Sequence, residues 1–228
     1  MLNCNSLNKI LLILLSIGWH SNAMGKKLVV SVEALPEGEW EKAELAMIEE
    51  ATQIVFDRIA SYKVAQCAYR QSFRVNKDQL RNKWGRQIPI LNKMDKVNII
   101  IRKQSMRREA LGSAIVGKAS VDRKNYRMEN LDINLNKDRV REFVQNRWQK
   151  TNSVHSNKNK ASLDKWVNVI AHELAHNYGY SHGTSGQYDN DYPGWFPTEL
   201  GFCVMTNGKY GSSLGDRKLR IKRQNKYR

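Results

Sequence analysis

The sequence predicts one domain with an α/β or α+β layer fold. Segments with strand and helix periodicity follow one another in the order strand, long helix, several strands, helix. The 228 residues are 41% hydrophobic and include six Trp and five Phe, which suits a buried core and argues against a wholly disordered chain. Three cysteines are too few for a disulfide-dense miniprotein. No apolar run approaches the about 20 residues that a membrane span needs, which excludes a polytopic membrane protein.

The first 23 residues have the pattern of a secretory signal peptide. Lys9 precedes the apolar run 10–17, and the small residues Ser21 and Ala23 follow it at the spacing of a cleavage site. We therefore expect cleavage near Ala23 and export of the protein, either secreted or periplasmic. The alternatives are a buried N-terminal helix or a single membrane anchor, although the run is too short to span.

The first strand and a long helix come next. Residues 27–34 alternate and are rich in β-branched side chains, which predicts a strand. After Pro36 and Gly38, apolar residues recur every three or four positions and predict a helix. Its acidic first turns and basic last turn complement the helix dipole. The residues assigned to its apolar face are Trp40, Ala43, Met47, Ala51, Ile54, Val55, Ile59 and Tyr62.

Further strands are expected in the middle of the chain. Residues 97–101 are apolar on both faces, which predicts a central strand. Residues 114–121 and 131–135 are expected to be strands as well, and 138–148 a short helix.

The last third of the chain holds a second long helix. Residues 151–160 are rich in Asn, Ser and Lys and predict a loop, after which Ser162 is expected to cap the helix. The helix has an apolar face made by Leu163, Trp166, Val167, Ile170, Ala171, Leu174 and Tyr178. Residues 211–228 contain seven basic residues and one acid, which predicts a basic tail or a solvated last helix. The expected domain is thus 24–210.

The residues that indicate chemistry lie at the end of that helix. His172 and His176 are four apart, so both project from one helix face and can hold one metal ion. Gly179 can end the helix and turn the chain, which would bring His182 back as a third ligand. Three neutral imidazoles favour a metal such as Zn²⁺ and leave a fourth position for water. Glu173 can then act as the general base.

The stretch from His172 to His182 resembles the motif H-E-x-x-H-x-x-G-x-x-H of the metzincin zinc metalloproteases. The residues of this motif most resemble those of the adamalysin (reprolysin) branch, and the match covers about residues 172–206. The resemblance implies a cleft with a twisted mixed sheet above, a long backing helix, the zinc helix at the floor and a small C-terminal subdomain. It further implies that Cys203-Val204-Met205-Thr206 is a methionine turn, with Met205 beneath the metal. The other interpretation of Met205 is an ordinary core residue.

The same resemblance implies that an edge strand within 114–121 pairs with an extended peptide substrate. Removal of the signal peptide leaves Cys67 and Cys203. In an oxidising compartment they are expected to form one disulfide, and the alternative is two buried thiols.

The function expected from these residues is hydrolysis of peptide bonds by a secreted zinc endopeptidase. It would bind one Zn²⁺ through His172, His176 and His182 and use Glu173 as general base. The net charge of +16 also allows contact with an acidic polymer or envelope surface, and we expect a monomer. Two alternatives stay open. One is an exported basic protein that binds anionic surfaces or nucleic acid and holds a structural zinc, and the other is a zinc amidase or peptidase acting on cell-wall peptides.

Overall fold

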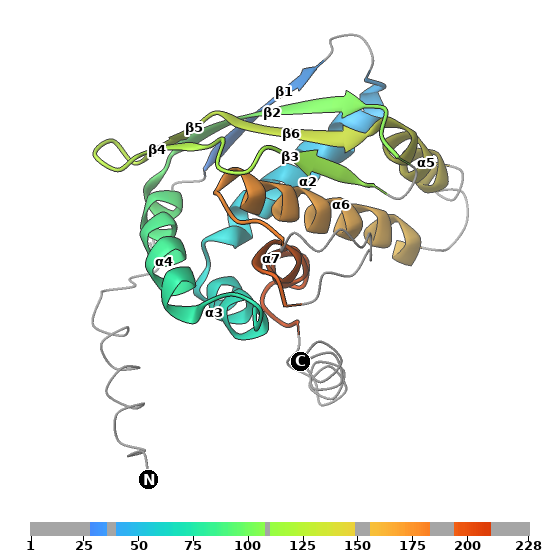
Figure 1. Cartoon of the computed structure of the whole chain (residues 1–228). Helices are drawn as coiled ribbons and strands as arrows, with labels where there is room; N and C mark the ends of the chain where they lie inside the picture. The colour runs from blue at the N-terminus through green and yellow to red at the C-terminus, as the bar shows by residue number, and fades with distance from the viewer. Residues whose placement is uncertain (1–27, 36–39, 108–109, 149–155, 183–193, 211–228) are drawn as a thin grey trace.

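The computed structural model describes residues 28–35, 40–107, 110–148, 156–182 and 194–210, without the side chains of 143–148 and 156–162. Within them the chain forms six helices, a mixed four-stranded sheet and a two-stranded hairpin (Figure 1). The expected mixture of helices and a mixed sheet is therefore present. The elements are β1 Val29–Leu35, α2 Lys42–Ile59, α3 Tyr62–Gln71, α4 Lys77–Lys93, β2 Lys96–Gln104, β3 Gly112–Ala114, β4 Ser120–Asp122, β5 Arg127–Glu129, β6 Leu131–Asn136, α5 Lys137–Trp148, α6 Ser156–Asn177 and α7 Phe196–Met205.

The sheet has the strand order β1-β2-β6-β3. The first three strands are parallel, and β3 runs antiparallel to β6 at the edge of the sheet. The expected strands at 27–34, 97–101 and 131–135 are thus confirmed as β1, β2 and β6, and β2 is central. Only one face of β2 is fully buried, because Ile99 and Ile101 face the helical side while Asn98 on the other face is exposed. The predicted central position of this strand is therefore confirmed, although its two faces differ in burial.

Helices α2 and α6 lie together on one side of the sheet (Figure 1). A buried ion pair also joins α2 to the sheet, since Lys103 Nζ of β2 lies 2.5 Å from Glu44 Oε2 and both side chains are at most 1% exposed. The same Glu44 oxygen accepts the Glu41 backbone N–H and so completes a capping box at the start of α2.

The predicted helix over residues 40–62 is two helices. Helix α2 ends at Ile59, and Ser61 starts α3, where its hydroxyl accepts the Val64 N–H. Tyr62 therefore does not lie on the α2 core face and is 52% exposed. Serine prefers the N-cap position, which explains why the chain restarts a helix there although the apolar period continues.

Helix α4 was not predicted. Its composition is polar, so the apolar residues form no clear helical repeat, and Pro89 is a residue that usually interrupts a helix. Two features of the sequence do indicate this helix. Asn76 is a favourable N-cap residue, and its side chain accepts the N–H groups of Asp78 and Gln79. Leu80 and Trp84, four residues apart, are both buried.

The segment 114–121 is not one strand, which corrects the prediction. Strand β3 ends at Ala114 and β4 begins only at Ser120. Between them the chain turns at Gly117, whose φ of 75° is in the left-handed region that favours glycine.

Helix α6 begins at Ser156, six residues before the predicted cap. Residues 156–160 are thus helical, and their assignment to a loop is wrong, as is a start at Ser162. The short helix predicted at 138–148 is confirmed as α5. The signal-peptide segment 1–23 and the tail 211–228 lie outside the described residues. Among the helices that are described, none combines the length and the apolarity required to cross a bilayer.

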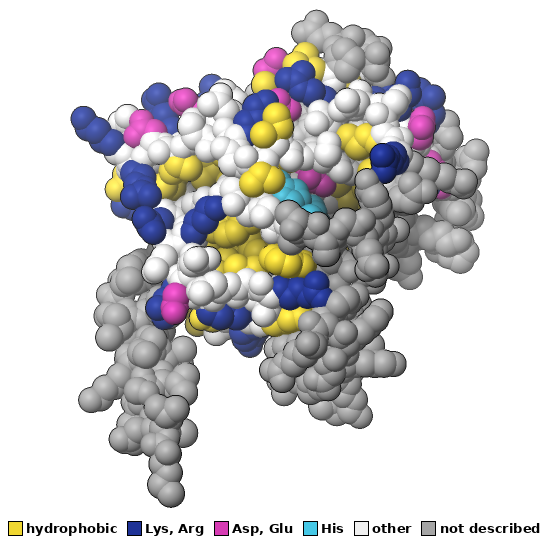
Figure 2. Space-filling model, in the orientation of Figure 1, with side chains coloured by type: hydrophobic (Ala, Val, Ile, Leu, Met, Phe, Trp, Pro, Cys, Tyr) yellow, Lys and Arg dark blue, Asp and Glu magenta, His cyan; other side chains and the backbone are white. Residues whose placement is uncertain are grey.

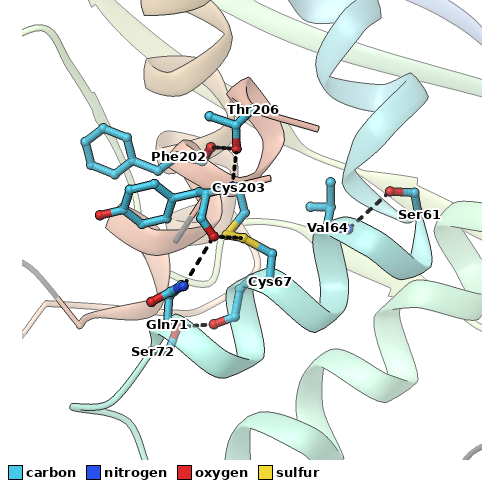
Figure 3. The surroundings of a disulfide bond; sticks show 10 residues. Ser61, Val64, Cys67, Gln71, Ser72, Phe202, Cys203 and Thr206 are labelled. Atoms are coloured by element: carbon cyan, nitrogen blue, oxygen red, sulfur yellow. Dashed lines mark hydrogen bonds between the residues drawn. A yellow bond between two sulfur atoms is a disulfide. The ribbon is translucent and has the colours of Figure 1, made fainter. Parts of the chain in front are cut away.

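Cys67 of α3 and Cys203 of α7 form a disulfide with a Cα–Cα distance of 5.8 Å (Figure 3). This confirms the expected bridge, and the alternative of two thiols is wrong. Around the bridge, the Gln71 side chain donates to the Tyr210 carbonyl at 3.2 Å. The disulfide therefore holds α7 against α3, and α7 in turn packs against α6.

Candidate metal centre

Three histidine side chains converge at the C-terminal end of α6. His172 and His176 lie on successive turns of the helix, and His182 comes from the segment after it. The His182 ring centroid lies 4.8 Å from each of the other two. One ligand nitrogen of each residue lies within 4.8 Å of the others, and the Nε2 atoms of His172 and His182 are 3.0 Å apart. The group can therefore hold a metal ion, as the spacing in the sequence indicates.

The return of the chain depends on Gly179. Its φ is 87°, and its N–H donates to His176 O while the Tyr180 N–H donates to Ala175 O. This pair of bonds is the Schellman motif that ends helices at a left-handed residue. The turn predicted at Gly179 is thus present, and it directs residues 180–182 back toward the histidine face.

An aromatic cluster around Trp84 of α4 packs against this turn. The ring of Trp84 in α4 contacts the rings of Tyr178, Tyr180 and Phe196, with centroid distances of 6.0, 6.2 and 5.1 Å. Gln87 of α4 donates to the Tyr178 carbonyl and accepts the Tyr180 hydroxyl. The helix missing from the sequence prediction therefore fixes the segment that carries His182.

The loop after β3 caps the same helix end. Gly117 N–H donates to His176 O at 2.8 Å, and Ala119 N–H donates to Asn177 O at 3.0 Å. These bonds satisfy carbonyls that the last turn of a helix leaves without partners.

Asn177 was not singled out in the sequence, yet it locks α6 to the sheet. Its side chain is fully buried, accepts the Asp132 N–H at 2.7 Å and donates to the Asp132 carbonyl at 3.0 Å. The feature of the sequence that could have indicated this role is a polar residue, Asn177, directly after the candidate ligand His176 at an otherwise apolar helix end.

Asp132 extends this link to the open face of the sheet. Its carboxylate accepts two bonds of 3.2 Å from the Arg102 guanidinium and one from Lys118. Burial acts to raise the pKa of Asp132, but the bonds from Lys118 and Arg102 outweigh it and lower that pKa below its ordinary value. Lys118 belongs to the loop that caps α6, so this charge pair holds the loop in place.

The histidines are in the form that binds metal. His176 Nδ1 lies 2.7 Å from the Tyr180 carbonyl, which only accepts, so Nδ1 carries the hydrogen and Nε2 keeps its lone pair. Burial, with the other two rings nearby, places the pKa of His172 well below its ordinary value. Burial also lowers the pKa of His176 and brings that of His182 to about 4. All three imidazoles are therefore neutral at pH 7.

Glu173 lies between α6 and the edge strand. It is only 6% exposed, and a Cβ placed on Gly112 of β3 would lie 3.0 Å from its Cγ and Oε1 atoms. Burial raises the pKa of Glu173 to about 8. Gly112 is a further residue that the sequence did not indicate, since its role depends on a helix 60 residues away.

Met205 is the last residue of α7, so residues 203–205 are helical and the turn begins only at Thr206. The assignment of the whole segment 203–206 to a turn is therefore wrong. The Met205 carbonyl accepts a bond of 3.0 Å from Arg58 of α2, and its side chain is partly buried against the core. Its place beneath a metal stays a prediction.

Figure 2 shows the histidine side chains at the surface, next to an acidic side chain and above hydrophobic ones. A separate hollow lies at the start of β2 and along β5, lined by Asp95, Lys96, Asn98 and residues 127–130. It includes none of the histidines.

No protein-family model, no curated protein and no solved structure matches this chain. Its function is therefore inferred from the residues themselves.

Proposed function

We propose that the protein is an exported zinc-dependent endopeptidase. The observation that carries the proposal is the convergence of three neutral imidazoles from His172, His176 and His182, together with the buried side chain of Glu173, which follows His172 in α6. Three histidines are a common ligand set of catalytic zinc, and they leave a fourth position to water or substrate. When bound, zinc acts as a Lewis acid toward a carbonyl oxygen and makes a coordinated water easier to deprotonate.

Glu173 supplies the proton transfers. It follows His172 in α6, and its Cγ and Oε1 atoms lie against Gly112 of the edge strand β3. In its ionised form it would accept a proton from the attacking water and return it to the nitrogen of the leaving amine. A bound zinc cation would favour this ionised form, whereas burial alone favours the protonated one. Because the Glu173 side chain is buried, bulk water is kept from competing for that proton.

Strand β3 offers a place for the substrate. It pairs with β6 on one side only and ends the strand order of the sheet. An extended peptide can add to such an edge through backbone hydrogen bonds, which would lay the scissile bond above Glu173. A long helix behind the sheet and a histidine-bearing helix below it also agree with the resemblance to metzincins.

A second candidate is a binding protein for anionic surfaces with a structural metal, which the net charge of +16 favours. Structural zinc sites usually have four protein ligands. The ligand group found among the described residues has three, and the buried Glu173 follows the first of them in the chain. The catalytic function is therefore the better supported one. Hydrolysis of cell-wall peptides rather than protein chains is a variant of the same chemistry.

The direct test is cleavage of a diverse library of unstructured peptides, with mass spectrometry of the products. We expect cuts by the zinc-loaded protein, none after treatment with a chelator, and recovery when zinc is restored. Cross-linked cell-wall peptides in the same assay distinguish an amidase. If the zinc-loaded protein cuts neither class, the proposal is wrong.

Replacement of Gly112 by Ala should separate catalysis from metal binding. The new Cβ would lie 3.0 Å from Glu173 Oε1 and 3.1 Å from Asn134 O, so the carboxyl must move. A shift of a few tenths of an ångström relieves this contact. Because a displacement of about 1 Å can cost about 100-fold in rate, we expect the smaller shift to lower kcat/KM by about three- to tenfold. Zinc content should not change. The matched control is Gly85→Ala, since no atom lies within 4 Å of a Cβ there. Equal activity of the two variants would contradict this position of Glu173.

A further inference from the structure

Basic side chains gather over α4 and the β4–β5 hairpin. Across residues 77–96 and 122–129, basic residues outnumber acidic ones nine to four. We call the exposed side chains of Arg81, Arg86, Lys93, Arg123, Lys124 and Arg127 the basic face. The two elements are joined directly, since Lys93 Nζ lies 2.9 Å from the Tyr126 hydroxyl. In Figure 2 several dark blue side chains lie on this side of the molecule, which is the α4 side of Figure 1.

The charge excess is not evenly spread over this surface. Asp78 is paired with Arg81 at 2.9 Å, and Asp95 and Glu129 share their hollow with Lys96 and Arg127. Asp122 lies in the hairpin and accepts the Lys124 backbone N–H. Arg86 on α4 and the two neighbouring residues Arg123 and Lys124 in the hairpin therefore provide the remaining excess of positive charge.

Lys83 of α4 connects this helix to the turn that carries His182. Lys83 Nζ donates to the Gly179 carbonyl at 2.5 Å and lies 4.4 Å from the centroid of the Tyr180 ring. Arg86 follows Lys83 by three residues and is therefore its neighbour on the helix surface. A peptide that extends from the histidines past this turn toward α4 would approach the basic face.

The chemistry of the face suits carboxylates better than nucleic-acid bases. Tyr126 is the large aromatic residue exposed on the described part of this surface, and the Lys93 ammonium lies 4.3 Å from its ring centroid. The ammonium covers one face of that ring, and a single exposed ring is a poor platform for the successive bases that single-strand sites stack on aromatic side chains. A surface made of lysine and arginine side chains favours the binding of a flexible acidic polypeptide.

We propose that the basic face recruits acidic polypeptides as substrates, so that cleavage occurs beside a run of Asp or Glu. This inference rests on the proposed function and names its substrate class. Such steering raises the rate of encounter, and it weakens with salt because mobile ions screen the charges.

The test uses one cleavable core sequence from the peptide library, extended on either side by four Asp or by four Asn. For one of the two sides we expect the Asp peptide to have about a tenfold higher kcat/KM at low ionic strength, and the ratio should approach one at about 1 M salt. The variant Arg86→Glu with Arg123→Glu and Lys124→Glu should lose this preference but still cut the Asn peptide. Arg141→Glu with Lys165→Glu is the control, because both residues are exposed basic residues on α5 and α6, away from α4.

A binding measurement keeps this test independent of catalysis. Fluorescence anisotropy gives the affinity of the Asp and Asn peptides for the Glu173→Gln protein, which does not cleave them. Wild-type protein that cuts the Asp and Asn peptides equally would overturn the substrate class and leave the peptidase intact. Protein that cuts no peptide would refute the proposed function, whereas acidic-peptide binding lost only in the triple variant would still support the basic face. Tighter binding of a single-stranded DNA oligonucleotide than of the Asp peptide would assign the face to nucleic acid and overturn the inference.

Discussion

Replacement of Glu173 by Gln should lower kcat/KM for peptide cleavage by about 10²–10⁴-fold, while zinc binding is retained. Glutamine has the same size and fits the same space against Gly112, but its amide cannot accept the proton of the attacking water. The His172, His176 and His182 ligand set is unchanged in this variant. The measurement is kcat/KM on a library-derived peptide together with zinc content by mass spectrometry.

The control for that substitution is Glu142→Gln. Glu142 is 51% exposed in α5 and is paired with Arg139, so its loss should leave kcat/KM within about twofold. A Glu173→Gln protein that cuts at the wild-type rate would remove the general base from the mechanism. If it instead lost zinc as well as activity, Glu173 would serve the site structurally.

Loss of the Cys67–Cys203 bridge is expected to have the largest effect on stability. The two cysteines are separated by 136 residues, so the bridge closes a long loop and restricts the unfolded chain. For loops of this length the chain-entropy model gives about 4–5 kcal/mol of the free energy of unfolding. This is a large share of the about 5–15 kcal/mol typical of a domain.

Urea unfolding of the wild type, with and without a reducing agent, measures this contribution. Cys67→Ala with Cys203→Ala should match the reduced wild type and should not respond to the reducing agent. Because the bridge holds α7 against α3, we also expect reduced protein to release zinc at lower urea. Identical urea midpoints for oxidised and reduced wild type would contradict this role.

The parts of the fold that were predictable are those specified by local pattern. Strands β1 and β2 are rich in β-branched residues, and β6 alternates apolar and polar residues. Helix α6 has a regular apolar face around Ile170 and Leu174. Elements of three residues, such as β3 and β4, are too short for a period to appear. The boundary at Ser61 was missed because the apolar spacing of α2 runs on into α3.

The same distinction holds for the site. His172, Glu173, His176, Gly179 and His182 lie within eleven residues, so helix geometry and one turn suffice to bring them together. Their supporting residues come from elsewhere in the chain. Gly112 of β3, Asp132 of β6 and Lys83 of α4 reach the site only through the packing of sheet and helices, which no local pattern encodes.

The most direct test of the central claim is the zinc stoichiometry of the purified protein. Equilibrium dialysis against micromolar zinc, followed by metal analysis, should give one zinc ion per wild-type chain. His176→Ala should bind less than a tenth of that amount at the same free zinc. A wild-type protein without zinc, or a His176→Ala protein with a full equivalent, would show that these histidines are not the metal ligands.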